Sequence, residues 1–118
     1  MPIYDTYRER LSGWYPRQGE VYSCQLDKIR PAIIVSPDSE NKSKHSAMVV
    51  PLTTQDRDNY GRSFALSAVD CGLRNRSWAK LAAAQEIDHD AILDNPIGKL
   101  AGTRLADLLS QLPRLSWS

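Results

Sequence analysis

The chain has 118 residues, of which 42% are hydrophobic and 25% are charged, and its formal net charge at pH 7 is +1. These values are ordinary for one globular domain, here expected over residues 1–118, and they exclude wholesale disorder, a collagen-like repeat and a long coiled coil. The charge balance also excludes a strongly basic nucleic-acid clamp, but it leaves open a basic face on one side of the molecule.

The N-terminal stretch is rich in aromatic and charged residues. Its large side chains recur mostly three or four positions apart, at Tyr4, Tyr7, Leu11, Trp14 and Tyr15. This spacing predicts an aromatic N-terminal arm over residues 1–16, in part a short amphipathic helix, that packs its stripe on the domain. A platform on which bases stack is the alternative use of such a stripe.

Strand signals dominate the next part of the chain. We expect strands over residues 20–26, 31–36, 46–54, 63–69 and 77–87. The second and third of these are apolar runs typical of strands buried on both faces, and the fifth is predicted as one long strand with small residues at its centre. The polar stretches 37–45 and 55–62 are expected as surface loops, and Asp70-Cys71-Gly72 as a turn.

The C-terminal part changes character. Residues 88–93 suggest a single helical turn, and residues 96–100 a short strand. Thr103 is the expected cap of a helix over residues 103–112, whose apolar stripe is Leu105, Leu108, Leu109 and Leu112. Pro113 cannot extend that helix. Several short strands and one terminal helix predict a mainly β fold, a small antiparallel barrel with a C-terminal α-helix against it.

Cysteines, histidines and glycines form no conventional site. Cys24 and Cys71 are too far apart for a metal motif, and we interpret them as partly buried thiols in a reducing compartment. The histidines are His45 and His89, and the Asp88-His89-Asp90 segment is interpreted as a solvated turn. No Gly-rich phosphate loop and no nucleophile elbow occurs. We therefore expect no metal and no cofactor.

The sequence pattern predicts neither a membrane-spanning helix nor a secretory signal. No apolar run approaches the ~20 residues of a membrane-spanning helix, and the N-terminus lacks a basic segment followed by an apolar stretch. We expect a cytoplasmic protein.

Arg30 and the threonines that follow the third strand are the most informative polar residues. Arg30 begins one apolar strand, and Thr53 and Thr54 close the next. If the two strands pair antiparallel, the start of one lies beside the end of the other, so that Arg30 and one threonine become neighbours at one rim of the sheet. A guanidinium and a hydroxyl are suited to grip a phosphodiester. The alternative is an ordinary strand threonine and a rim salt bridge of Arg30 with Asp27 or Asp56.

Several segments occur in a particular order: Gly19-Glu20-Val21-Tyr22, Arg30-Pro31-Ala32-Ile33-Ile34-Val35-Ser36, Met48-Val49-Val50-Pro51-Leu52-Thr53-Thr54-Gln55, Cys71-Gly72-Leu73 and Ile97-Gly98-Lys99-Leu100. In this order the chain resembles the MazF/PemK family of toxins from type II toxin–antitoxin systems, over roughly residues 17–113. The resemblance implies an SH3-like barrel, a homodimer and a metal-independent endoribonuclease. Such an enzyme cuts single-stranded RNA at short sequences, inhibits growth and is blocked by a cognate antitoxin protein.

The resemblance also implies roles for individual residues. Arg30 matches the arginine that serves the scissile phosphate, and Thr53 the threonine beside it; both are expected to be catalytic. The substrate-binding residues it implies are Lys28, Thr54, Gln55 and Gln85. The RNA 2′-hydroxyl is the nucleophile in the family chemistry, and the product is a 2′,3′-cyclic phosphate.

The chain departs from the family pattern in three places. Only Lys28 and Ile29 separate Leu26-Asp27 from Arg30, where relatives carry a longer loop that covers the RNA. Ala82-Ala83-Ala84-Gln85 replaces a segment with a basic residue, and the aromatic leader is longer than usual. The first two departures favour the alternative function, a non-catalytic CcdB-like toxin that binds and poisons DNA gyrase. A barrel used only for protein interaction is a third hypothesis.

Overall fold

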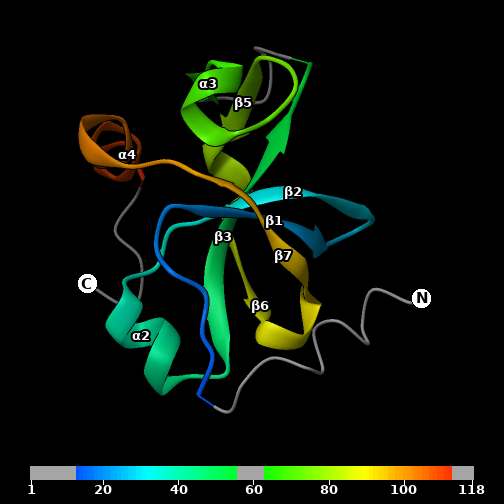
Figure 1. Ribbon diagram of the computed structural model, residues 1–118, viewed down its shortest axis with the longest axis vertical. Helices are drawn as coiled ribbons and strands as arrows, with labels where there is room; N and C mark the ends of the chain where they lie inside the picture. The colour runs from blue at the N-terminus through cyan, green and yellow to red at the C-terminus, as the bar shows by residue number, and fades with distance from the viewer. Residues whose placement is uncertain (1–12, 56–62, 113–118) are drawn as a thin grey trace.

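The computed structural model describes residues 13–55 and 63–112 (Figure 1). The strands are β1 (Glu20–Gln25), β2 (Ile29–Ile34), β3 (Ser46–Thr53), β4 (Ser63–Leu66), β5 (Ser77–Lys80), β6 (Gln85–Asp88) and β7 (Ile92–Lys99). The helices are α2 (Asp38–Ser43), α3 (Ala68–Cys71) and α4 (Gly102–Ser110), with 3-10 turns η2 (Leu81–Ala83) and η3 (His89–Ala91).

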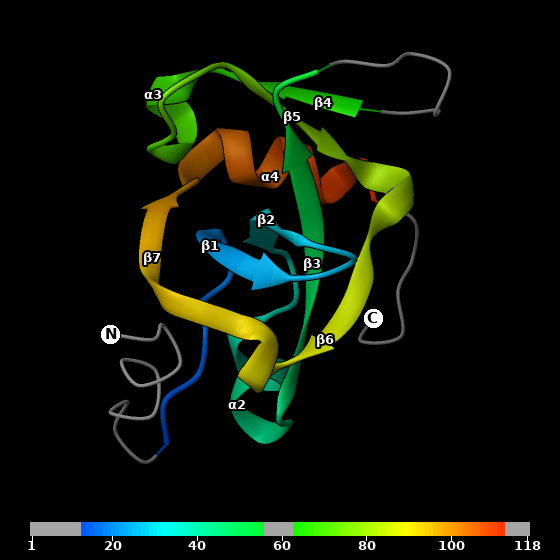
Figure 2. The same cartoon turned by 90° about the vertical axis from the view of Figure 1, so that its right-hand side faces the viewer.

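One curled antiparallel sheet organises the molecule. Its strand order is β4-β5-β3-β2-β1-β7, and β6 pairs with the first half of β3. Among the described residues β4, β6 and β7 each pair with one strand only and remain edges, so the barrel-like sheet does not close. Figure 2 shows α4 on one side of β1–β3, while the chain from β6 through η3 to β7 wraps around the other side. The expected mainly β fold with a C-terminal helix is confirmed.

Both faces of the central strands are buried, and successive residues alternate between two apolar clusters. The first cluster lies under α4 and includes Val21, Ile33, Val35, Val50, Leu52 and Leu108. The second includes Tyr22, Cys24, Ala32, Ile34, Ala47, Val49 and Ile92. Because neighbouring side chains of a strand point to opposite faces, a strand buried on both sides is apolar at every position. The prediction of strands buried on both faces over residues 31–36 and 46–54 is thereby confirmed, with slightly different bounds.

The predicted long strand over residues 77–87 is wrong, because β3 exchanges one neighbour for another along its length. β6 pairs with β3 over Ser46–Val49, and β5 pairs with β3 at Leu52 and Thr53. The turn η2 lies between β5 and β6 in the chain. Pro51 falls in the interval between the two pairings, and a proline, which cannot donate a backbone hydrogen bond, is tolerated in a strand at such an irregularity.

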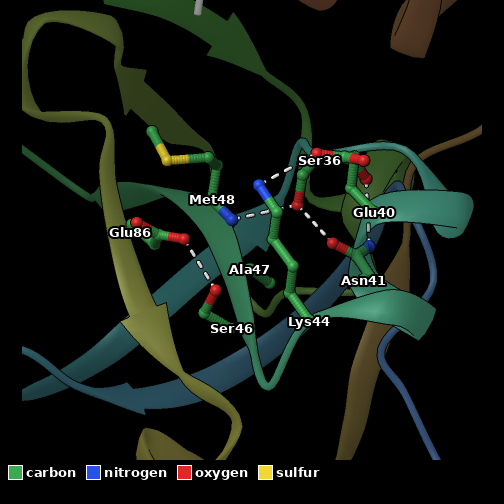
Figure 3. Close-up of a pocket in the computed structure, with 8 residues that line it drawn as sticks. All are labelled: Ser36, Glu40, Asn41, Lys44, Ser46, Ala47, Met48 and Glu86. Carbon is green, nitrogen blue, oxygen red and sulfur yellow. Dashed lines mark hydrogen bonds and ion pairs between the residues drawn. The ribbon is translucent and has the colours of Figure 1, made fainter. Parts of the chain in front are cut away.

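The stretch 37–45 is not the predicted loop, because it contains α2. The Asn41 side chain is fully buried there and donates to the backbone oxygens of Pro16 and Ser36, each at 3.0 Å, while the Ser36 hydroxyl donates to its amide oxygen. Ser36 Oγ also accepts from the Met48 N–H at 2.9 Å. Figure 3 shows Ser36, Asn41 and Met48 among the residues that line a small pocket between α2 and β3, where Ser46 also donates to Glu86 at 2.6 Å. The buried Asn41 amide thus stabilises α2, a helix that the sequence does not predict because it has no apolar periodicity.

Helix boundaries differ from the predictions in two further places. The strand expected over residues 63–69 stops at Leu66, since Ser67 forms a capping box with Asp70 and starts α3. At the C-terminus Ala101 is the N-cap of α4, and Thr103 lies exposed inside the helix instead of capping it. The predicted leucine stripe is confirmed, with Leu108 fully buried and Leu105, Leu109 and Leu112 packed around it. Pro113 lies outside the described residues.

The described end of the aromatic arm packs where the sequence predicted a solvated turn. The Trp14 ring meets the rings of Tyr22 and His89 edge-on, with centroids 6.2 and 5.5 Å apart. His89 is buried at 5% exposure, so the interpretation of its segment as solvated is wrong, although the single helical turn is confirmed as η3. Residues 1–12 of the expected arm, including Tyr4, Tyr7 and Leu11, lie outside the described residues.

Gly19 joins three segments at the point where the last helix departs. Its N–H donates to Ile34 O at 2.7 Å, and its carbonyl accepts from the Leu100 N–H at 2.8 Å. Its φ is +94°, and a Cβ there would lie 2.4 Å from Leu100 O. Only glycine fits this close approach of two backbones.

Candidate functional site

Arg30 leaves a tight turn as the second residue of β2. The turn is closed by the Leu26 N–H, which donates to Lys28 O at 3.1 Å. The side chain of Arg30 is 24% exposed, and its Nη2 lies 3.1 Å from Asp27 Oδ2. Its Nε is buried without a hydrogen-bond partner among the described residues. The rim salt bridge with Asp27 is therefore present, but it satisfies only part of the guanidinium's hydrogen-bonding capacity; Asp56, the other expected partner, lies outside the described residues.

Asp27 is the ion-pair partner of Arg30, and its pKa reflects this contact. Desolvation acts to raise its pKa, but the hydrogen bond from the Lys28 backbone and the positive charge of Arg30 outweigh it, so the pKa of Asp27 lies below its ordinary value. The carboxylate is ionised at neutral pH and points one edge of the guanidinium toward itself. The ion pair favours one orientation of Arg30, although the Asp27 side chain is largely exposed.

The register of the sheet places Thr53 on the same face as Arg30. β2 and β3 pair at Ala32↔Pro51, and continuing this antiparallel register by two residues sets Arg30 opposite Thr53. Ala32 and Val49 lie in the second cluster, and alternation by two puts Arg30 and Thr53 on that same side of the sheet. Along this face the covered apolar surface ends and a polar rim begins.

Thr53 is also the last residue of its strand. Its Oγ1 accepts a hydrogen bond from the Gln55 N–H at 3.1 Å, which ends β3 in a local turn. Thr54 lies beyond the strand and is exposed. The two threonines predicted from the sequence are therefore not equivalent, because only Thr53 shares the face of Arg30 by register.

The remaining predicted residues are divided between this face and the turns beside it. Gln85 begins β6 opposite Val49, and Ile87 two residues later packs on the second cluster, so Gln85 lies on the face of Arg30 and Thr53. Its side chain is exposed. Lys28 and Gln55 are exposed in the turns that flank Arg30 and Thr53. The structure thus gathers Arg30, Thr53 and Gln85 on one face.

Sequence reasoning missed Trp78. Its Cα pairs with that of Thr53, so the indole lies on the face of the candidate site. Lys80, two residues later in β5, shares this face. The signal was present in Ser77–Lys80, where two small buried residues alternate with Trp78 and Lys80, but the segment was interpreted only as part of one long strand.

These side chains carry groups that can bind a phosphodiester. An arginine with unused donors binds phosphate oxygens by charge-assisted hydrogen bonds, and a hydroxyl adds one further donor. Within residues 13–55 and 63–112 no group of three or more His, Cys, Asp or Glu side chains could hold a metal ion. In the same part of the chain no helix has the length and apolar character needed to cross a membrane.

A family model decides which proteins this chain is related to. The model for the PemK-like, MazF-like toxin of type II toxin-antitoxin systems matches residues 17–115, which is most of the chain. The chain belongs to this toxin family. The resemblance of the ordered motifs to MazF/PemK toxins is confirmed, and no curated protein sequence matches the chain.

Solved structures of MazF toxins share its fold. The Mycobacterium tuberculosis toxin MazF-mt6 is 26% identical with a TM-score of 0.64, over 77% of this chain and 92% of that one. A MazE-MazF structure from Deinococcus radiodurans is 18% identical with a TM-score of 0.67, over 84% of this chain and 92% of that one. An endoribonuclease from a mycobacterial species is 23% identical with a TM-score of 0.65, over 91% of this chain and all of that one. The toxin covers nearly the full length of each, so its fold is that of a MazF toxin.

Proposed function

We propose that this toxin is an endoribonuclease that cleaves single-stranded RNA and slows growth when its antitoxin is absent. The proposal rests on the shared face of Arg30 and Thr53, which follows from alternation along β2 and β3 and from extending their register two residues beyond Ala32↔Pro51. Membership of the PemK-like, MazF-like toxin family supports it, as does the mycobacterial neighbour that is itself described as an endoribonuclease.

The proposed reaction uses the RNA as its own nucleophile. The 2′-oxygen gives up its proton and attacks the adjacent phosphorus, the bond to the 5′-oxygen breaks, and that oxygen leaves with a proton. The products are a 2′,3′-cyclic phosphate and a 5′-hydroxyl. The nucleophile, phosphate and leaving group all belong to the RNA, so the proposal assigns no step to a metal ion.

Arg30 and Thr53 act on the phosphate in this proposal. Negative charge grows on the phosphate oxygens as the fifth bond forms, and the Arg30 guanidinium stabilises it by charge-assisted hydrogen bonds. Asp27 keeps the guanidinium oriented through the 3.1 Å contact. The Thr53 hydroxyl donates to a phosphate oxygen or orients the 2′-hydroxyl. Lys28, Thr54, Gln55 and Gln85 contact the RNA on either side.

A cognate antitoxin and a second copy of the toxin are the proposed protein partners. Structural neighbours include MazE-MazF structures and a mycobacterial endoribonuclease in complex with its cognate antitoxin. An antitoxin that covers the face of Arg30 would block access of RNA to it. This gives inhibition without any change in the fold of the toxin.

Removal of the Arg30 guanidinium tests the proposed reaction. Arg30→Ala should lower the cleavage rate of a single-stranded RNA by roughly 100-fold or more, the loss typical of one oxyanion-stabilising donor. Lys42→Ala is the matched control, because Lys42 is an exposed cation on α2, away from the rim. Thermal unfolding of both variants shows whether they fold. Cleavage by folded Arg30→Ala at the rate of the unaltered toxin would contradict the proposal.

Binding to DNA gyrase without catalysis is the second candidate function. The three residues between β1 and β2 leave no room for a loop that covers bound RNA, and Ala82 and Ala83 lie in η2 without a basic side chain. A gyrase poison would inhibit supercoiling in a purified assay and leave RNA intact. The endoribonuclease proposal expects the opposite result in both assays.

A further inference from the structure

Trp78 lies directly beside the candidate site, in the middle of a three-strand segment. Its Cα pairs with Thr53 of β3 on one side and with Ala65 of β4 on the other. Cross-strand partners have Cβ atoms roughly 4.5–5.5 Å apart, so the indole begins within one side-chain length of the Thr53 hydroxyl. The largest aromatic side chain of the sheet therefore adjoins the residue proposed to contact the phosphate.

The indole is not part of the core of the protein. Ser77 and Ala79 on either side of it are buried toward the first cluster, where Ala79 packs with Leu52 and Phe64. Alternation turns Trp78 to the other face, where it is only partly covered. Among the described residues its ring has no aromatic or cationic partner, and its indole N–H has no hydrogen-bond partner. Part of the indole is therefore exposed without an aromatic or cationic group stacked on it among the described residues.

Small and basic residues lie next to Trp78 on this face. Its two cross-strand partners, Thr53 and Ala65, are both small, and Trp78 itself is partly exposed. Lys80 shares the face two residues along β5, and Arg30 lies on it across β3 by register. An aromatic side chain on a face that also carries basic residues is typical of surfaces that bind single-stranded nucleic acid, because bases stack on the ring while phosphates meet the charges.

We propose that Trp78 is a stacking platform for the nucleobase next to the scissile phosphate and thereby helps to determine which RNA sites are cut. The proposal rests on the proposed RNA-cleaving function, which it deepens. Its ligand is an unpaired base of single-stranded RNA, held flat on the indole while Arg30 and Thr53 hold the adjacent phosphate. A duplex would hide that base, so the platform also favours single strands.

Two substitutions of Trp78 separate the effect of losing its aromatic ring from the effect of losing side-chain volume. Trp78→Leu keeps an apolar side chain and removes the aromatic face, whereas Trp78→Phe keeps a smaller face. We expect kcat/KM on a single-stranded RNA to fall roughly 5- to 100-fold in Trp78→Leu, the loss typical of one base–aromatic stack. Trp78→Phe should stay within about 3-fold of the unaltered toxin, since every base can still stack on its ring. Cleavage by folded Trp78→Leu at the unaltered rate overturns the inference and leaves the endoribonuclease proposal standing.

A binding measurement tests the platform without cleavage. The same RNA with 2′-O-methyl groups lacks the nucleophile and therefore stays intact. It should quench the tryptophan emission of the unaltered toxin more than that of Trp78→Phe, in which only the other two tryptophans report. Equal quenching of both proteins overturns the inference even if Trp78→Leu fails to fold.

The combined outcomes distinguish the two proposals. If the unaltered toxin binds 2′-O-methyl RNA with quenching that depends on Trp78 but cuts no RNA, the platform stands and the endoribonuclease proposal falls. If Trp78→Leu cuts RNA normally and escapes only the antitoxin, the surface is a protein-binding one and the platform is overturned.

Discussion

At the scale of single residues, Arg30 at the rim of the sheet forms fewer hydrogen bonds than its guanidinium can donate. Asp27 takes one Nη of Arg30, and no described residue bonds its buried Nε. A buried donor without a partner costs free energy, and a bound phosphate would supply the partner that Arg30 Nε lacks. The ion pair thus serves to aim the guanidinium rather than to saturate it.

Thr53 and Thr54 provide the sharpest test of the strand register. Thr53→Val keeps the β-branched shape and deletes the hydroxyl, so RNA cleavage should fall by roughly 3- to 10-fold or more, which corresponds to one hydrogen bond of about 0.5–1.5 kcal/mol and a stronger one to a charged phosphate. Thr54→Val should cost less, because Thr54 lies beyond β3 and off the face of Arg30. Both rates are measured on one RNA at one salt concentration.

The Thr53 test also needs a measurement of stability. The hydroxyl accepts from the Gln55 N–H, so its loss loosens the turn after β3 as well. Urea unfolding of the two valine variants separates this effect from catalysis. A larger loss of cleavage in Thr54→Val than in Thr53→Val would show that the register at this rim is shifted by one residue.

At the scale of elements, Arg104 connects α4 to the β4–β5 end of the sheet. Its guanidinium lies 4.5 Å from the centroid of the Phe64 ring, donates to Ala65 O and approaches the Asp70 carboxylate at 3.7 Å. It thus reaches β4 and α3 from one helix. Since β4 pairs with β5, these contacts also support the strand that presents Trp78.

Asp70 makes the stability of this region depend on pH. The Ser67 backbone N–H donates to its carboxylate, and despite partial desolvation this bond, the Ser67 hydroxyl and Arg104 hold the pKa of Asp70 below the ordinary value of 3.8. A carboxyl whose pKa is lower when folded contributes stability above pH 3.8 and loses it as the pH falls through the folded value. The free energy of unfolding should therefore fall below pH 3.8.

Asp70→Asn should remove this part of the pH dependence. Its free energy of unfolding in urea should lie below that of the unaltered toxin at neutral pH and approach it in acid. Asp107→Asn is the control, because Asp107 is an exposed carboxylate that meets the same arginine at 3.9 Å from within α4. A constant difference between Asp70→Asn and the unaltered toxin at every pH would refute the assignment.

At the scale of the whole molecule, one end carries apolar groups that a second copy would cover. Val69 on α3 is 92% exposed and Ile97 on the edge strand β7 is 40% exposed, and α3 packs against β7. An open strand edge beside exposed apolar side chains favours pairing with another chain. We expect a homodimer at micromolar concentration by light scattering, weakened by Ile97→Lys. A stable monomer of the unaltered toxin would contradict this.

Much of the fold was predictable because local patterns report burial. The apolar runs of β2 and β3 indicated burial on both faces, and the leucine stripe indicated α4, since each pattern follows from the geometry of one element. The order of the strands predicted Arg30 beside either Thr53 or Thr54, because two consecutive antiparallel strands bring the start of one to the end of the other, and the resemblance to MazF/PemK toxins selected Thr53. The sequence by itself therefore determined the strand-rich core and the terminal helix, whereas the roles of Arg30 and Thr53 stay predictions.

Tertiary structure alone decided where distant segments meet. The break between β5 and β6 depends on which half of β3 each one joins, and α2 depends on an amide buried against residues from two other segments. From the sequence, Trp78 is only an aromatic residue in a strand, and the β3–β5 register places it beside Thr53. Periodicity along a chain reports which side chains are buried, but it carries no information on which distant strand becomes a neighbour, and that pairing assembles the site.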